Sequence, residues 1–194
     1  MFLTRKPPEW MIREFLLRQA KCEFSYTEIG ASRSSVPKGY TVDHNRLKLG
    51  AGQLVFEAAQ QALRNWEMFH LGWLELCWPN VGIEEETVVA VLIHHWSFWS
   101  LNACRIVYIK EEKGSVERYG FAYGTLPDHS ECGEERFTVE WHRDDDSVWY
   151  DLFAFSKPNH WLAKIGYPLS RHLQKRFAED SKEAMLRAVK VIAV

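Results

Sequence analysis

Apolar and polar positions alternate along much of the second half of the chain and then recur at helical spacing. From about Thr87 to Phe155 the alternation is typical of strands with one buried face, as in ACRIVYIKEE, VERYGFAYGT, EERFTVEWH and SVWYDLFAF. From about Pro158 to Lys190 apolar residues recur every three or four positions, which predicts an amphipathic helix. A sheet followed by such a helix must bury one face against it. The pattern predicts an α+β fold, and in one common solution a curved antiparallel sheet wraps around the long C-terminal helix and leaves a cavity between them.

The first half of the chain predicts fewer elements. Proline suits the first turn of a helix, so a helix is expected from Pro7-Pro8-Glu9 to about Ala20. Tyr40–Leu49 alternates as a strand does, and Gln53 to about Trp73 has helical spacing. Within the last helix, Pro168 cannot occupy an interior turn without a kink. We therefore expect a short turn over 158–166 and then a main helix with Pro168 in its first turn.

Length and composition are those of a soluble globular protein. The 194 residues fit one domain, with an N-terminal helical extension over 1–22 and the helix-wrapping core over 24–190. Nine Trp, seven Tyr and eleven Phe supply aromatic area that can fill a core or line a pocket. A net charge of −2 argues against a nucleic-acid partner, which needs a basic face.

Cysteine spacing and hydropathy limit the metal sites and the cellular compartment that the sequence predicts. The four cysteines are widely spaced and form no Cys/His cluster of zinc spacing, so no metal site is expected. No cofactor fingerprint occurs either. The N-terminus lacks the apolar run of a signal peptide, and no stretch approaches the roughly 20 apolar residues of a membrane span. We expect a cytoplasmic protein with free thiols; its oligomeric state stays open.

Five segments carry a resemblance to a known family. They are FSYTEIG, GYTVDHNRLKLGAG, FAYGTLPDHSECGEERFTVE, WYDLFAFSKP and GYPLSRHLQKRFAEDSKEAM. Together they resemble the uncharacterised UPF0548 family, and the resemblance covers nearly everything after about Phe24. That family in turn resembles the START-like, Bet v 1-like superfamily with its helix-grip fold. The resemblance implies an apolar ligand, such as a lipid, sterol or polyketide, between sheet and helix, and in some members cyclase, dehydratase or hydrolase chemistry.

One strand places a carboxylate among aromatic residues. Asp151 shares a strand face with Trp149, Phe153 and Phe155 if the alternation holds. A buried carboxylate must be paired or change its pKa, because an unpaired buried charge costs several kcal/mol. Asp151 is therefore part of a structural salt bridge or a polar anchor for a ligand. Its candidate partners are Arg105, Arg136 and Arg171.

Histidines next to carboxylates give weaker signals. His129 and Glu131 would share a face if that stretch were extended, but it lies in a predicted turn region, where a hydrogen-bonded loop is the simpler explanation. His94 and His95 point to opposite faces of a strand and cannot chelate one ion together, so one of them is expected to face inward.

We therefore predict binding of a small hydrophobic or amphipathic ligand, without assigned catalytic residues. One rival is an enzyme that uses Asp151 or His129 as a general base in the same cavity; another is an interaction module with a filled core. An error of one face in strand register would invert half of the predicted lining. The predicted lining residues are Tyr119, Phe121, Tyr123, Trp149, Asp151, Phe153 and Leu169.

Overall fold

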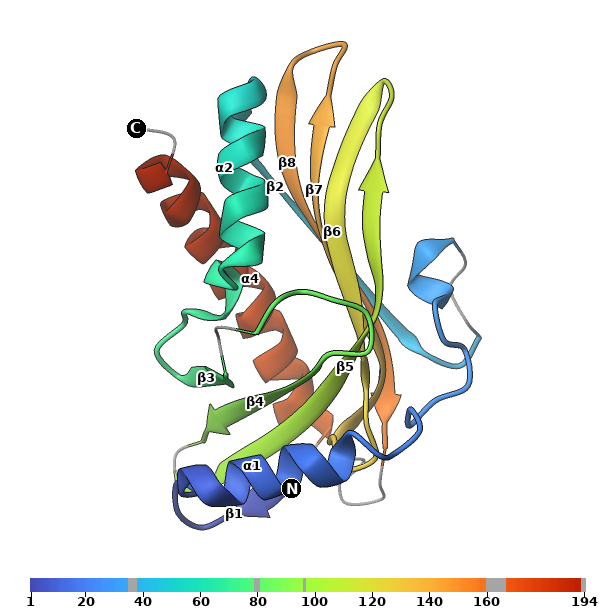
Figure 1. Ribbon diagram of the computed structural model, residues 1–194, viewed down its shortest axis with the longest axis vertical. Helices are drawn as coiled ribbons and strands as arrows, with labels where there is room; N and C mark the ends of the chain where they lie inside the picture. Colours follow the sequence, from blue (N-terminus) through green and yellow to red (C-terminus); the bar gives the residue numbers. More distant parts are fainter. Residues whose placement is uncertain (35–37, 79–80, 96, 160–166, 193–194) are drawn as a thin grey trace.

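One curved antiparallel sheet forms the frame of the molecule (Figure 1). The computed structural model describes residues 1–34, 38–78, 81–95, 97–159 and 167–192. Neighbouring strands follow the order β2-β8-β7-β6-β5-β4-β3, and β1 pairs with the start of β5. The strands are β1 (Phe2–Leu3), β2 (Thr41–Ala51), β3 (Leu74–Cys77), β4 (Val88–His94), β5 (Trp99–Glu112), β6 (Val116–Thr125), β7 (Glu131–His142) and β8 (Ser147–Pro158).

Two helices pack on the concave face of the sheet, and one packs on the opposite, convex face (Figure 1). Helices α2 (Gln53–Arg64) and α4 (Tyr167–Ile192) share the main core cluster with the strands. Helix α1 (Glu9–Gln19) contributes Ile12, Phe15 and Leu16 to a second cluster, on β4 and β5. The predicted architecture of a curved sheet around a long C-terminal helix is confirmed. No helix among the described residues is long and apolar enough to cross a membrane.

Strand β4 is apolar on both sides because both faces of the sheet are covered there. Val89 and Val91 belong to the concave cluster, whereas Ala90 and Leu92 belong to the cluster under α1. All four are buried. This double coverage explains why Thr87–His95 is an almost continuous apolar run rather than an alternating one.

Helix α4 begins where its proline requires. Pro168 is the second residue of the helix, where its missing N–H costs nothing, as the sequence predicts. Pro158 is the last residue of β8. Most of the short turn expected over 158–166 lies outside the described residues.

The helix predicted from Gln53 to about Trp73 is wrong in its second half. Helix α2 ends at Arg64, and a short 3-10 turn spans Glu67–Phe69. Trp66 has a left-handed backbone (φ 57°), which an α-helix cannot contain, while its buried indole donates to the Val81 carbonyl over 3.2 Å. The chain then forms β3, a strand that the sequence analysis missed.

Candidate functional site

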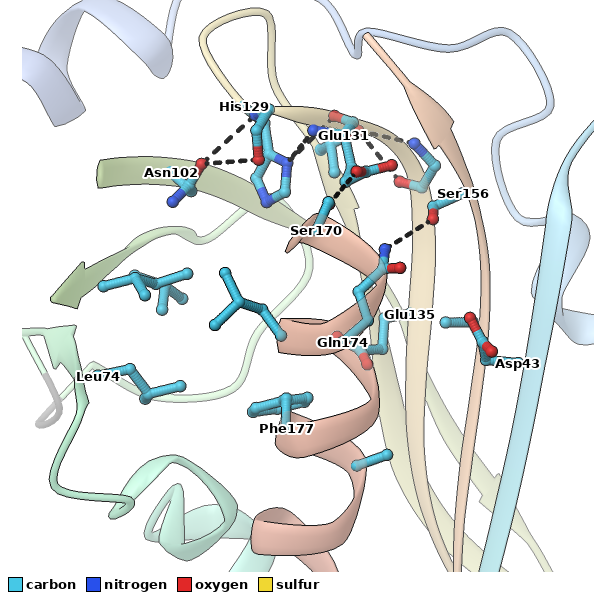
Figure 2. A pocket seen from close by; sticks show the side chains of 18 of the residues that line it. Asp43, Leu74, Asn102, His129, Glu131, Glu135, Ser156, Ser170, Gln174 and Phe177 are labelled. Carbon is cyan, nitrogen blue, oxygen red and sulfur yellow. Dashed lines mark hydrogen bonds between the residues drawn. The ribbon is translucent and has the colours of Figure 1, made fainter. Parts of the chain in front are cut away.

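A pocket of about 900 Å³ lies between the concave face of the sheet and the first half of α4 (Figure 2). Strands β2 to β8 contribute one side, and α4 contributes the other. Two apolar side chains that line it, Phe2 and Leu169, are also exposed, which places them at its rim. Most of the wall is apolar, including Phe69, Trp73, Leu74, Val91, Ile93, Leu152, Leu173 and Phe177.

An aromatic cluster closes the pocket at one side by filling the space under α2. The ring centroids of Trp66 and Phe121 lie 5.0 Å apart, and those of Phe121 and Phe137 lie 5.2 Å apart. Phe69 bridges to α4, where its ring lies 5.3 Å from that of Phe177. The concave face is therefore filled in one region and hollow in the next.

Polar side chains gather at the end of the pocket near the start of α4 (Figure 2). The backbone N–H of Glu131 lies 3.0 Å from Nδ1 of His129. A backbone N–H can only donate, so Nδ1 accepts and the neutral ring carries its proton on Nε2, although the Glu131 carbonyl oxygen is also near, at 3.1 Å. Among the described residues, Nε2 has no hydrogen-bond partner.

Burial sets the protonation of His129 and Glu131 at this end of the pocket. It lowers the pKa of His129 to about 4, helped by the nearby positive N-terminus, so the imidazole is neutral at pH 7. Burial also raises the pKa of Glu131. The Ser170 hydroxyl, which donates to the carboxylate, opposes that shift, as do the Ser156 hydroxyl and the positive charge of Arg171. The second carboxylate oxygen of Glu131, Oε2, has no hydrogen-bond partner in the described structure.

A second carboxylate faces the pocket four residues further along β7. The Tyr123 hydroxyl donates to Oε2 of Glu135 over 2.7 Å. Burial raises the pKa of Glu135 to about 7; the Tyr123 hydrogen bond opposes the shift and the negative charge of Asp43 adds to it. Asp43 itself is paired with Arg171 over 2.6 Å. The pocket thus holds a carboxyl group that changes protonation near neutral pH.

Gln174 connects α4 to the sheet beside these groups. Its side-chain amide donates to the Ser156 hydroxyl over 3.0 Å and its carbonyl oxygen accepts from Arg171 over 2.7 Å. Both Ser156 and Gln174 line the pocket. The bond to Ser156 holds the first turns of α4 against β8, and the bond from Arg171 lies within α4.

Of the seven predicted lining residues, the structure places Tyr123 and Leu169 at the pocket. Tyr119 and Phe121 share the predicted face with Tyr123, but they are buried in the filled core instead. Tyr119 packs there under the Arg64 guanidinium, which lies 4.3 Å from the ring centroid.

The prediction that Trp149, Asp151 and Phe153 line the cavity is wrong, because these residues lie on the convex face. Leu152 pairs with Phe137 in the sheet, and it is Leu152 that faces the concave side. Successive residues of a strand point to opposite faces, so Asp151 must point outward.

Asp151 is part of a structural salt bridge, which is the other role that the sequence analysis gave for this residue. Its carboxylate lies 2.9 Å from Arg136, 2.6 Å from Nε2 of His44 and 3.2 Å from Arg46. Of the other two candidate partners, Arg105 donates to backbone carbonyls and Arg171 pairs with Asp43.

His94 and His95 point to opposite faces of the strand, as the sequence predicts. His95 lines the pocket and lies 2.9 Å from the Ser100 hydroxyl through Nε2. His94 is exposed and stacks on Trp99, with ring centroids 4.2 Å apart.

Sequence reasoning missed Glu135, whose only signal is its place beside Glu134 in a strand that is otherwise buried. Glu134 faces the convex side and accepts from the Tyr26 hydroxyl and the Gly30 N–H, each over 2.7 Å, and from the Ser32 N–H over 3.0 Å. The two adjacent carboxylates therefore lie on opposite faces of the sheet. Glu134 anchors the 26–32 loop and Glu135 lines the pocket.

Comparison with known proteins places this chain in a family. The model of the domain of unknown function DUF1990 matches residues 25–184. A UPF0548 protein of Dictyostelium discoideum is 35% identical, with 97% of this chain and 96% of that protein covered. A UPF0548 protein of Deinococcus radiodurans is 33% identical, with 97% and 98% covered.

Among solved structures, the Zhui aromatase/cyclase from Streptomyces sp. R1128 is similar with a TM-score of 0.49. It is 12% identical, and the match covers 78% of this chain and 94% of that one. The two sequence relatives span nearly the whole chain at over 30% identity, and the domain model matches most of it. The chain belongs to the UPF0548 family, the family of the domain of unknown function DUF1990.

Proposed function

We propose that this protein binds a small hydrophobic or amphipathic ligand in the pocket between the sheet and α4. The observation that carries the proposal is a pocket of about 900 Å³ with apolar walls and polar groups gathered at one end. Pockets of this size and character are typical of small-molecule sites. Burial of an apolar ligand would contribute about 25 cal/mol for each Å² of apolar surface removed from water.

The rim of the pocket supports the same proposal. Phe2 and Leu169 are exposed apolar side chains that line it from β1 and α4. Exposed apolar residues that border a hollow are common at ligand-binding grooves. They give an apolar ligand a surface to contact before it enters.

Native mass spectrometry of the purified full chain, followed by solvent extraction, tests the proposal. We expect a stoichiometric adduct of an apolar compound, or binding when an apolar compound library is added. The Ala154→Trp variant fills the pocket from β8, where Ala154 is half-buried, and should lose the adduct.

The matched control is Lys48→Trp, which adds the same side chain to the convex, exposed side of the neighbouring strand β2. This variant should retain the adduct. A clean apo mass that no apolar compound shifts, or equal loss in both variants, would contradict the proposal.

Acid–base catalysis in the same pocket is a second candidate, favoured by one observation. Glu135 lines the pocket, accepts from Tyr123, and has a pKa of about 7, the range in which a carboxyl group exchanges protons readily at neutral pH. Conversion of a bound compound by the native protein, but not by Glu135→Gln, would support this candidate. Release of the compound unchanged from both would count against it.

A further inference from the structure

The polar end of the pocket offers one acceptor and one donor that no described residue uses. Glu131 is 6% exposed, and its Oε2 has no hydrogen-bond partner. Nε2–H of His129 likewise has none within the described ranges. A buried polar atom without a partner is costly, and such an atom in a pocket wall indicates a missing ligand group. The carboxylate of a glutamate turns at low cost about its last torsion, so Glu131 can present this oxygen to a ligand.

The charges around this end are of both signs and do not favour an anionic ligand. Glu131 and Glu135 both line the pocket from β7, but Lys175 also lines it and the positive charge of Arg171 acts on Glu131. A third carboxylate, Asp43, is paired with Arg171. A carboxylate or phosphate ligand would therefore lie beside carboxylates as well as cations, and its charge gains little there.

The same end disfavours a cationic ligand. The N-terminal ammonium of Met1 is held by the carbonyl oxygens of Leu101 and Asp128, each at 2.8 Å. It lies close enough to His129 for its charge to act on the imidazole. A ligand ammonium would therefore lie near an existing positive charge, and it has no lone pair to accept from Nε2–H.

A hydroxyl group satisfies both unused positions, because it donates one hydrogen bond and accepts others. Resting on the proposed function, we propose that the ligand is a neutral apolar molecule bearing a hydroxyl group, which donates to Glu131 and accepts from His129. The rest of the molecule lies against the apolar wall formed by residues such as Leu74, Ile93 and Phe177.

A matched set of four fluorescent probes tests the proposal on the full chain. The probes are 1-pyrenemethanol, its methyl ether, 1-pyrenecarboxylate and pyrene itself, titrated at pH 7.5 and followed by anisotropy. The ether keeps the acceptor of the alcohol and loses its donor. The alcohol should bind about tenfold more tightly than the ether, as expected for one hydrogen bond to a charged group. The carboxylate should bind more weakly than pyrene.

The Glu131→Met variant removes the acceptor and keeps the length of the side chain. It should abolish the preference for the alcohol over the ether while pyrene binds as before. Glu140→Met is the control, because Glu140 lies on the same strand and its carboxylate bonds Arg46 and Arg118 on the convex side. This control should keep the full preference.

The outcomes separate this inference from the proposed function. If pyrene binds but the alcohol and ether bind alike, or the carboxylate binds best, the hydroxyl proposal is overturned and ligand binding stands. If none of the four probes binds, both are overturned. If Glu131→Met fails to fold by circular dichroism, the preferences of the native protein alone still decide between these results.

Discussion

Glu134 and Glu135 are adjacent on β7, yet their carboxylates lie on opposite faces of the sheet and in opposite chemical settings. Glu134 accepts hydrogen bonds from Tyr26 and from two backbone N–H groups of the 26–32 loop. Glu135 accepts from Tyr123 and lines the pocket. One carboxylate is surrounded by donors and holds a loop in place, whereas the other titrates near neutral pH. The sheet thus separates a structural side from a candidate binding side.

The titration of Glu135 predicts how stability depends on pH. Its pKa in the folded protein is about 7, above the ordinary value of 4.5, so the folded state binds the proton more tightly than the unfolded state. Its contribution to stability is therefore present below pH 4.5 and is lost as the pH rises toward 7. Glu135→Gln should reduce the fall in unfolding free energy between pH 5 and pH 8 by on the order of 1 to 3 kcal/mol.

Urea unfolding at the two pH values measures this effect. Glu57→Gln, on the exposed side of α2, is the control and should leave the pH dependence as it is in the native protein. Identical pH profiles for the native protein and Glu135→Gln would contradict the assignment.

His129 should remain neutral across the physiological range, with its proton on Nε2. Burial holds its pKa at about 4, below the ordinary 6.5. The unfolded state then takes up the proton first, so this group lowers stability as the pH falls from 6.5 toward 4. Nitrogen-15 NMR of the imidazole should show the Nε2–H tautomer at pH 7 and no titration between pH 5 and pH 8. A midpoint near 6.5, or a proton on Nδ1, would show that the ring is not held as described.

Replacement of Gly124 by alanine should destabilise the convex face. A Cβ at this position would lie 2.2 Å from the Tyr26 hydroxyl, which is the group that donates to Glu134. Tyr26 must move, and the buried carboxylate loses a partner. We expect a loss of about 2 kcal/mol or more in urea unfolding. Gly82→Ala, where the nearest atom is a flexible Glu84 side-chain oxygen at 3.4 Å, should be nearly neutral. Equal effects would mean that Tyr26 adapts freely.

Asp151 should matter for stability and not for the pocket. It is 3% exposed and lies within ion-pair distance of Arg136, Arg46 and His44. Asp151→Ala leaves the two arginines and His44 without their common partner and should cost about 2 to 4 kcal/mol in urea unfolding. Binding of 1-pyrenemethanol by the remaining folded protein should be unchanged. Asp144→Ala, in the exposed turn before β8, is the matched control for stability. Weaker probe binding by folded Asp151→Ala would show that Asp151 does contribute to ligand binding.

Much of the fold follows from local pattern. Alternation correctly placed β2 and β5 to β8, and it grouped Tyr119 with Tyr123 on one face and Trp149 with Asp151 on another. Pro168 correctly marked the start of α4. In contrast, the end of α2 depends on the buried indole of Trp66 and its bond to Val81, a contact that local helical spacing does not contain.

The sequence by itself determined which residues share a strand face, because side chains alternate across a sheet with a period of two. It did not determine which face turns toward α4. Both faces of β8 carry aromatic residues, since the 24–34 loop and α1 cover parts of the convex side as α2 and α4 cover the concave side. Only the tertiary structure decided that Leu152 faces the pocket and Asp151 does not. A shift of β8 by one residue of register would turn its other face, with a different set of side chains, toward α4.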